Sequence, residues 1–484
     1  MMHGENLKHS EKSSVVCADV DGSVINTDLL FETLLFALKQ DVWIIFYLPF
    51  WLIRGRAYLK RQLADRALGL AVDLLPVNAS VISYLRAAAE SGQRVMLTSA
   101  SDVRLIERLA DQFDFVSGVI GSDGITNRKG SAKAQAIREV VGDSSWEYIG
   151  DSNADFDVWR ESSQVVCVAS DPAFARRVSN RYPKVIVLEK EPCTIKVLLR
   201  ALRVHQWMKN LLVFSPLVLA HQIFNSQGWL VACGAALSFS LCASGVYLLN
   251  DLLDLEADRR HPRKKKRPCA SGVFPLSYAL ALAPILFIAA FAVALTIQPQ
   301  FAVILGIYFI LTSAYSYRLK ALALVDIILL AILYTIRIVG GGIATGVHVS
   351  QWLLGLSMFV FFSLACVKRF SELLVLQQRK EHRTWGRGYA VSDMEQVASF
   401  GTASGYIAVL VLALYVSGRE VAELYKNPAV IWMACPLLLY WISRIWLLAR
   451  RGLVHDDPLV FALQDKVTYA VAAIGALIFF GAKW

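Results

Sequence analysis

Three aspartates directly follow an apolar stretch in the middle of the chain, and their spacing suits metal binding. Asp251, Asp254 and Asp258 come after residues 243–249 at helical intervals. In a helix this spacing places the three carboxylates on one face. Carboxylates gathered at a membrane boundary repel one another unless a cation lies among them, and such oxygen ligands suit Mg²⁺ bridged to substrate phosphates. The pattern predicts a magnesium site that handles a diphosphate, with a solvated helix end as the alternative.

Basic residues come immediately after these aspartates. The segment from Arg259 to Arg267 carries seven Lys and Arg residues. Such side chains bind phosphate oxygens, so Lys264 and Arg267, with Lys209 upstream, are candidates to bind the diphosphate or a second phosphate. Basic loops also set the topology of membrane proteins, which is the alternative explanation for each of these residues.

A second group of polar residues lies in the first third of the chain, where each pair follows a short apolar run. The pairs are Asp19 with Asp21, Thr98 with Ser99, and Asp151 with Asp155, after the runs 14–18, 94–97 and 146–149. Lys133 opens a helical stretch between the second and third runs. An open α/β sheet offers its ligand groups at the carboxyl ends of its strands. The order of these pieces therefore predicts one site on an α/β domain.

The composition divides the chain in two. It has 484 residues, 56% of them hydrophobic, and a mean hydropathy of +0.47, which excludes an ordinary soluble enzyme. Residues 1–200 have a soluble composition, whereas long apolar runs dominate from about residue 205. We therefore expect two domains, 1–195 and 196–484. The eight cysteines form no CxxC pair, which argues against a zinc site or a disulfide framework.

Nine apolar segments are each roughly long enough to cross a bilayer, which takes about 20 residues. Lys and Arg gather in alternate loops, which the positive-inside rule places in the cytoplasm. Because the N-terminus lacks an apolar signal segment, we expect the first domain and both sites to be cytoplasmic, on a bacterial inner membrane. The loops account for the net charge of +10 without nucleic acid. The segments lie near 210–224, 228–249, 275–297, 299–317, 322–346, 351–374, 397–418, 428–449 and 466–484.

The stretch from Asn250 to Asp258 resembles the first signature of the UbiA-type prenyltransferase superfamily, over roughly residues 200–484. Within it, four flanking stretches resemble the decaprenyl-phosphate phosphoribosyltransferase branch. The resemblance implies a nine-helix, all-α membrane enzyme with Mg²⁺ at Asp251, Asp254 and Asp258. That branch transfers 5-phosphoribose from phosphoribosyl diphosphate (PRPP) onto a polyprenyl phosphate and releases pyrophosphate. The four stretches are 203–210, 261–268, 315–320 and 368–372.

One departure from the superfamily concerns the acceptor. Where a second acidic cluster is usual, residues 315–326 hold the single acid Asp326 beside Arg318 and Lys320. A cationic second site suits a lipid phosphate, which needs no strong general base, and Lys320 and Lys368 are candidates to steer it. Polar groups within apolar segments, such as Arg337, are functional by default. The full set of expected substrate-binding residues is Lys209, Asn250, Lys264, Arg267, Tyr315, Lys320 and Lys368.

The first domain resembles the haloacid-dehalogenase (HAD) phosphohydrolases, over roughly residues 10–190. The resemblance implies an α/β, Rossmann-like fold with Asp19 as the nucleophile and Asp21 as the general acid and base. Thr98 and Lys133 would bind the transferring phosphoryl group, with Ser99 and Lys129 as their alternatives. Asp151 and Asp155 would hold Mg²⁺ together with Asp19. A catalytically inactive domain is the alternative.

The stretch 25–92 is expected to form a helical cap on this domain. It contains the apolar segment 42–53, which is too short to cross a membrane and is followed by Arg54 and Arg56. Aromatic residues beside basic ones are typical of an interfacial segment. One hypothesis is that the cap lies on the membrane and recruits a lipid-linked substrate. The alternative is a helix buried against its own domain.

Together the two halves predict consecutive steps. The first would make a polyprenyl-phosphoryl-5-phosphoribose, and the second would remove its 5-phosphate to give polyprenyl-phosphoryl-ribose, a precursor of ribo- or arabinofuranose donors. The expected partners are PRPP, the lipid phosphate, the membrane and, as a candidate, a second copy of the chain. Three alternatives stay open: an aromatic prenyltransferase with an unrelated phosphatase, a lipid-binding or transport protein, and a membrane-anchored phosphatase of soluble metabolites.

Overall fold

The computed structural model describes residues 15–380, 387–418, 421, 425–454 and 457–483. It divides into two compact units. The first comprises Met1–Leu202 and Leu248–Leu282, and the second comprises Arg203–Tyr247 and Ala283–Trp484. The segment that carries Asp251, Asp254 and Asp258 thus groups with the N-terminal residues.

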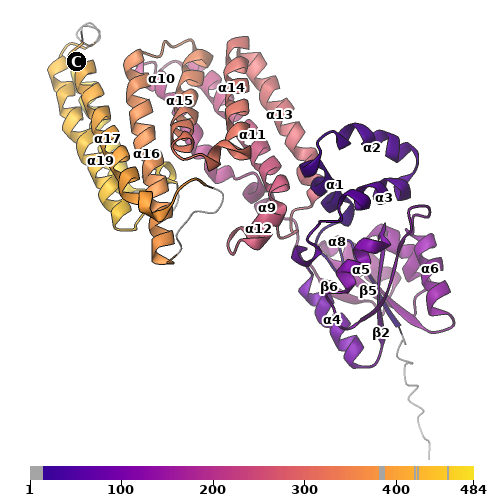
Figure 1. The fold of residues 1–484 in the computed structure, drawn as a ribbon. Coiled ribbons are helices and arrows are strands. Elements are labelled where there is room, and N and C mark those ends of the chain that lie inside the picture. Colours follow the sequence, from indigo (N-terminus) through magenta and orange to yellow (C-terminus); the bar gives the residue numbers. More distant parts are fainter. Residues whose placement is uncertain (1–14, 381–386, 419–420, 422–424, 455–456, 484) are drawn as a thin grey trace, which may run out of the picture. The chain divides into compact units, whose positions relative to one another are not determined.

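A six-stranded parallel sheet forms the centre of the first unit (Figure 1). Its strand order is β3-β2-β1-β4-β5-β6, so the chain starts in the middle and builds outward to both edges. The expected α/β architecture of the N-terminal region is confirmed. The strands are β1 (Val15–Asp19), β2 (Arg94–Asp102), β3 (Val116–Ser122), β4 (Trp146–Gly150), β5 (Gln164–Ala169) and β6 (Ile186–Glu189).

Side chains that alternate along each strand build a separate apolar core on each face of the sheet. One core joins Val16 and Leu97 to α4 (Ala79–Glu90) and α5 (Val103–Ala110). The other joins Cys17 and Tyr148 to the helices that follow β3, β4 and β5. These are α6 (Ser131–Val141), α7 (Phe156–Trp159) and α8 (Pro172–Arg181). Both faces are covered, as a parallel sheet requires.

Between β1 and β2 the chain forms the helices expected of a cap. In Figure 1 the first three lie together, apart from the helices that cover the sheet. The connection ends in the short 3-10 helix η1 (Val72–Leu74) and in α4. The three cap helices are α1 (Leu29–Gln40), α2 (Ile44–Ile53) and α3 (Arg56–Arg66).

The second unit is helical, and with α11 and α13, which begin or end in the first unit, it accounts for the apolar half of the chain. Eight helices in the described residues are long and apolar enough to cross a membrane. The prediction of nine is not confirmed, because the segment near 210–224 forms the 3-10 helix η3 (Val204–Phe214) and the short α10 (Ser215–Leu219). The long helices are α11 (Ser226–Leu253), α13 (Leu276–Ile297), α14 (Pro299–Tyr317), α15 (Val325–Thr345), α16 (Gln351–Gln378), α17 (Met394–Val416), α19 (Ala434–Arg450) and α21 (Lys466–Lys483).

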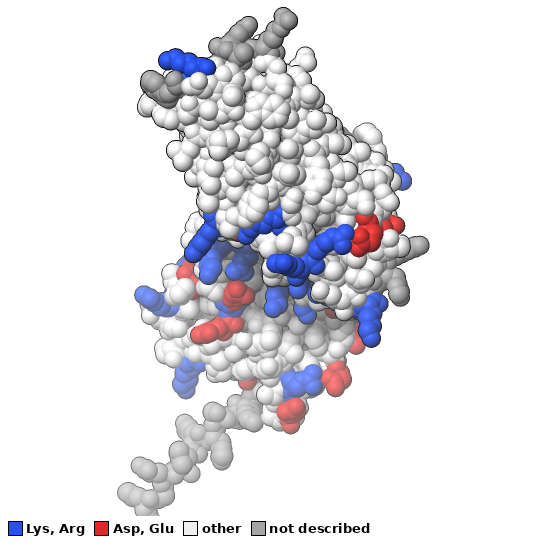
Figure 2. All heavy atoms as spheres, turned by 90° about the vertical axis from the view of Figure 1, so that its left-hand side faces the viewer, with Lys and Arg blue, Asp and Glu red and all other residues white. Residues whose placement is uncertain are grey.

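The surface of this helical unit is largely uncharged. Figure 2 shows a broad white area on the face that it presents, with Lys and Arg gathered toward one end. Many apolar side chains on α13 and α14, such as Ile288 and Ile310, are exposed. Apolar surface of this extent fits lipid rather than water as the surrounding medium.

Candidate functional site

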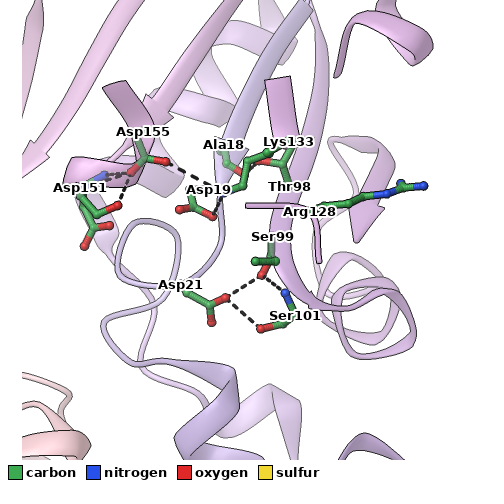
Figure 3. Close-up of polar contacts among 12 residues, drawn as sticks. Ala18, Asp19, Asp21, Thr98, Ser99, Ser101, Arg128, Lys133, Asp151 and Asp155 are labelled. Atoms are coloured by element: carbon green, nitrogen blue, oxygen red, sulfur yellow. Dashed lines mark hydrogen bonds and ion pairs between the residues drawn. The ribbon is translucent and has the colours of Figure 1, made fainter. Parts of the chain in front are cut away.

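Three carboxylates of the first unit meet at the carboxyl ends of β1 and β4. Asp19 is the last residue of β1, Asp151 directly follows β4, and Asp155 closes the short helix η2 (Asn153–Asp155). One oxygen from each lies within 4.8 Å of the others. Figure 3 shows the three side chains turned toward a common space. Three hard oxygen donors at this spacing suit Mg²⁺.

A buried lysine holds two of these carboxylates together. The Lys133 Nζ atom, on α6, donates to Asp19 Oδ1 at 2.8 Å and to the Tyr148 hydroxyl at 2.9 Å. The Tyr148 hydroxyl in turn donates to Asp155 Oδ1 at 3.0 Å. Asp155 Oδ2 accepts from the Ser152 N–H and hydroxyl, which fixes its orientation. The Asp19 side chain is thereby held by a cation that can also meet a phosphoryl oxygen.

The pKa values of two of these carboxyl groups are raised, which indicates that the group lacks positive charge. Burial raises the pKa of Asp19 well above its usual range, against the opposing effect of Lys133, and Asp155 and Asp21 raise it further. Burial, with a contribution from Asp155, likewise raises the pKa of Asp151 to about 7, while Lys190 opposes it. Clustered carboxylates shift in this way when no further cation balances them. The donor set therefore fits a divalent cation among Asp19, Asp151 and Asp155.

Asp21 lies two residues on and faces the cap. Its Oδ2 accepts from the Ser99 hydroxyl at 2.6 Å and from the Ser101 hydroxyl at 3.0 Å. Its Oδ1 accepts from the Leu29 N–H, at the start of α1. The Thr98 hydroxyl instead donates to the Ala18 carbonyl within the sheet. Ser99, named as the alternative to Thr98, thus contacts Asp21, whereas Thr98 lies opposite Asp19 on the neighbouring strand.

Gly22 allows the loop after β1 to pass close to the metal ligands. Its φ is +81°, and a Cβ atom there would lie 2.1 Å from Asp151 Oδ2. Only glycine combines this backbone conformation with so close an approach.

Three residues of this site were not predicted from the sequence. Tyr148 lies in β4 and looks like an ordinary core aromatic. Lys60, on the cap helix α3, donates to the Ala100 carbonyl at 2.6 Å, between the two serines that bind Asp21. Lys190 donates to the Gly22 carbonyl and lies 3.7 Å from Asp151. Lys129, the alternative to Lys133, is exposed.

The aspartate-rich segment forms a second polar group in the first unit. Asp251 lies in the last turn of α11, Asp258 lies on α12 (Leu255–Arg260), and both are buried. The Arg267 guanidinium joins them, at 3.2 Å from Asp251 Oδ1 and 2.5 Å from Asp258 Oδ2. The carboxylates expected to surround a metal ion thus already share one cation, Arg267.

The three aspartates do not lie on one continuous helix as expected. Asp254 has φ −100° and ψ 13°, which interrupts the helix between α11 and α12. Within the residues that the structure describes, the group of Asp19, Asp151 and Asp155 meets the spacing of a metal site, whereas Asp251, Asp254 and Asp258 do not. Asn250 lies one residue before Asp251 in α11, and Lys264 is exposed in the 3-10 helix η4 (Lys264–Lys266).

A cavity of about 510 Å³ adjoins this segment within the first unit. Its lining includes four basic side chains and one acidic one. Such a lining favours an anionic occupant. The charged residues are Arg200, Arg259, Lys265, Lys266 and Glu191.

In the second unit, two of the predicted lysines meet a carboxylate that the sequence did not single out. Asp457 Oδ2 lies 2.5 Å from the Nζ of Lys209 and 3.1 Å from that of Lys368. The Tyr334 hydroxyl also donates to Asp457. Lys209 and Lys368 are 159 residues apart in the chain, yet they share one buried counter-ion, which forms a basic centre in the helical unit.

Asp326, the single acid of the second candidate region, is engaged in an ion pair. It lies 2.5 Å from Arg369 and accepts from the Tyr389 hydroxyl. The Arg369 guanidinium also donates to the Tyr315 hydroxyl at 3.2 Å. Lys320 lies on the short helix η5 (Leu319–Ala321), partly exposed. The region is therefore a balanced network of cations and carboxylates rather than an acidic cluster.

The fold and these groups define a multi-pass membrane protein that carries an α/β unit. The model of the UbiA prenyltransferase family matches residues 211–464. The chain belongs to the UbiA prenyltransferase family.

Relatives in this family differ in how much of the chain they share. The protein y4nM of Sinorhizobium fredii is 33% identical over 97% of this chain and 90% of its own. The decaprenyl-phosphate phosphoribosyltransferase of Mycolicibacterium smegmatis is 31% identical over 58% of this chain and 92% of its own. A solved UbiA homolog from Archaeoglobus fulgidus, bound to GPP and Mg²⁺, is 18% identical over 59% of this chain and 99% of its own, with a TM-score of 0.45.

Proposed function

We propose that this membrane protein transfers 5-phosphoribose from PRPP to a polyprenyl phosphate and then removes the 5-phosphate from the product. The family supports a transferase, and the relative named decaprenyl-phosphate phosphoribosyltransferase supports this donor and acceptor. The observation that carries the second step is the buried contact of Lys133 with Asp19 beside Asp151 and Asp155.

In the transfer step, an oxygen of the lipid phosphate forms a bond to C1 of the ribose as the bond from C1 to the diphosphate breaks. Pyrophosphate leaves with the bonding electrons. Asp251, Asp254 and Asp258 would hold Mg²⁺, which supplies charge stabilisation to the leaving group. We assign Arg267 and Lys264 to bind the diphosphate, and the pairing of Arg267 with two of these aspartates supports this role.

The acceptor side of the proposal rests on the second unit. Lys209 and Lys368 meet at Asp457, and Arg369 contacts Tyr315. These cations suit an anionic lipid head group, with Lys320 and Asn250 as further candidates to bind the substrates. The positive charges of Lys209, Lys368 and Arg369 keep the acceptor phosphate ionised, so no base is needed for its attack.

In the second step, a carboxylate oxygen of Asp19 bonds to phosphorus as the ester oxygen of ribose leaves. Asp21 gives that oxygen its proton, and later takes a proton from the water that hydrolyses the aspartyl phosphate. Lys133 and Thr98 bind the phosphoryl oxygens, with Ser99 as the alternative to Thr98. Mg²⁺ at Asp19, Asp151 and Asp155 would neutralise charge on the phosphoryl group.

Two domains and their side of the membrane follow from this function. We assign residues 1–195 to the phosphatase domain, with a cap at about 25–92, and 196–484 to the transferase domain. Both sites face the cytoplasm at a bacterial inner membrane, with the basic loops on that side.

The purified full chain, with Mg²⁺, labelled PRPP and a polyprenyl phosphate, provides the test. Wild type should yield a dephosphorylated lipid-linked ribose. Asp19→Asn should accumulate its phosphorylated precursor, because the transfer step is intact. Asp143→Asn, which alters an exposed aspartate of the same unit, is the matched control and should behave as wild type. Absence of label in the lipid fraction would refute the transferase, and precursor accumulation in wild type would refute the phosphatase.

A further inference from the structure

The cap helix α2 has no charged residue in its ten positions, and it buries very little of its surface. Ile44 and Trp51 are its buried residues, and Leu48 between them is half-buried. This one stripe packs in a small core with Ala37 and Leu63 of α1 and α3. A helix on the surface of a soluble domain normally carries polar residues on its other faces. Here those faces are apolar too.

The exposed apolar residues of α2 and of the two positions before it form what we call the α2 apolar surface. Their exposure ranges from 52% to 83%, so the alternative that α2 is buried in its own domain is excluded. Contiguous apolar surface of this kind marks a site of interaction with a partner or a membrane. The surface consists of Val42, Trp43, Ile45, Phe46, Tyr47, Phe50, Leu52 and Ile53.

Cations flank this surface on both sides along the chain. Lys39 precedes it, with the acidic Asp41 between them, and Arg54 and Arg56 follow it, all exposed, so the flanking charge is net positive. A helix of ten residues is about 15 Å long, half of the about 30 Å of a bilayer core. It therefore cannot cross a membrane, whereas aromatic and aliphatic side chains flanked by Lys and Arg fit the boundary between acyl chains and anionic head groups.

We infer that the α2 apolar surface inserts into the bilayer surface, in the same membrane that the long helices of this chain cross. The occupant is lipid, because the chain carries its own membrane anchor and its flanking charges are complementary to anionic head groups. If the proposed phosphatase is right, the insertion also defines its substrate class. The substrate is then a phosphomonoester presented at the membrane surface.

Contacts of the buried side of α2 link this helix to the catalytic residues through α3. The Arg66 guanidinium of α3 lies 4.5 Å from the centre of the Trp51 ring. Lys60, on the same helix, donates to the Ala100 carbonyl, and the neighbouring Ser99 and Ser101 bind Asp21. Insertion of α2 therefore brings the Asp21 side of the site to the lipid surface through two packed helices.

The first test measures lipid contact and needs no activity. The full chain is reconstituted in vesicles of equal parts phosphatidylglycerol and phosphatidylcholine that contain a phosphatidylcholine with a photoreactive acyl chain. After illumination, mass spectrometry locates the labelled peptides. Label is expected in residues 42–53 as well as in the spanning helices. Replacing Phe46, Phe50 and Ile53 by Ser should lower the label in 42–53 about tenfold, because three inserted apolar groups are lost.

A second measurement tests the substrate class. The triple variant should hydrolyse a lipid-linked 5-phosphoribose about tenfold more slowly than wild type, since lipid docking is lost, and soluble ribose 5-phosphate at an unchanged rate. The matched control combines Val140→Ser and Ile125→Ser, two exposed apolar positions elsewhere in the unit, and should match wild type in both assays.

The outcomes separate the two proposals. An unlabelled 42–53 peptide beside labelled spanning helices would overturn the insertion, as would cross-links from this peptide to a second copy of the chain. If residues 42–53 are labelled in wild type but the triple variant loses the same rate on the lipid-linked and on the soluble substrate, the inferred membrane-presented substrate is overturned. Normal label in a wild type that hydrolyses neither substrate would overturn the phosphatase and leave the insertion standing.

Discussion

Glu32 of the cap helix α1 and Arg259 of α12 form a buried ion pair with two contacts, of 2.6 and 3.0 Å. Their side chains are 2% and 7% exposed. Each partner makes one further hydrogen bond: the Thr27 hydroxyl donates to Glu32, and Arg259 donates to the Ala270 carbonyl. Arg259 directly follows Asp258, so a carboxylate of the N-terminal residues fixes the segment that carries the aspartate-rich motif.

Glu32→Gln should strongly destabilise the first unit. Removing one charge of a buried pair leaves the other uncompensated, at a cost of about 3–5 kcal/mol. The thermal unfolding midpoint of the detergent-solubilised chain measures this effect. Glu256→Gln removes the exposed pair with Arg260 and is the matched control, with an expected cost of about 0–1 kcal/mol. Equal midpoints for the two variants would contradict a structural role for the buried pair.

Gly22→Ala should weaken the response of the phosphatase to Mg²⁺ while the fold persists. The new Cβ would meet the Asp151 carboxylate at 2.1 Å and displace a proposed metal ligand. Phosphate release as a function of Mg²⁺ concentration is the measurement, and the half-saturating concentration should rise at least tenfold. Gly92→Ala is the control, since Gly92 has a similar φ of +87° with nothing within 4 Å of the added Cβ. A similar loss in both variants would mean that backbone strain, not the close approach, causes the defect.

The strand-end residues of the first unit were the most predictable part of the site. A parallel sheet brings the carboxyl ends of its strands to one edge, so short apolar runs that end in Asp19 and Asp151 suffice to predict their meeting. Lys133 is 114 residues from Asp19, and its phosphoryl-binding role came only through the resemblance to a family. Tyr148 could not be found, because an aromatic residue in a buried strand is indistinguishable from core packing.

The sequence was enough to predict that the second half of the chain forms long apolar helices, but not which polar side chains contact one another there. Hydropathy marks the long helices, because a membrane demands about 20 apolar residues for each. It did not mark the break at Asp254, which depends on a local backbone conformation. Nor does any local pattern show that Arg267 joins Asp251 to Asp258, or that Asp457 joins Lys209 to Lys368, since these contacts arise only on folding.

Arg267→Met should abolish the transfer step and make the protein more dependent on Mg²⁺. The substitution leaves Asp251 and Asp258 buried without their shared cation, so a metal ion becomes the remaining source of positive charge. Transfer of label from PRPP should fall at least about a hundredfold if one charge on the leaving group is lost. Added Mg²⁺ should raise the thermal unfolding midpoint of the variant more than that of wild type.

Lys264→Met is the control for this variant, because Lys264 is exposed in the same loop. It should keep the wild-type response of the unfolding midpoint to Mg²⁺, and any effect should be confined to the KM for PRPP. An identical response of the midpoint to Mg²⁺ in Arg267→Met and wild type would show that the aspartates do not form the metal site.

Lys133→Met should reduce dephosphorylation far more than Lys129→Met. The Lys133 ammonium is buried against Asp19 and Tyr148, where it can bind a phosphoryl oxygen, whereas Lys129 is exposed. Loss of a buried charge that stabilises the transition state costs about a hundred- to a thousandfold in kcat. The assay is phosphate release from the lipid-linked 5-phosphoribose, with the transfer step followed in parallel. Transfer should be unchanged in both variants, because neither lysine belongs to the transferase site. Dephosphorylation that survives Lys133→Met but fails with Lys129→Met would reverse the assignment of the two lysines.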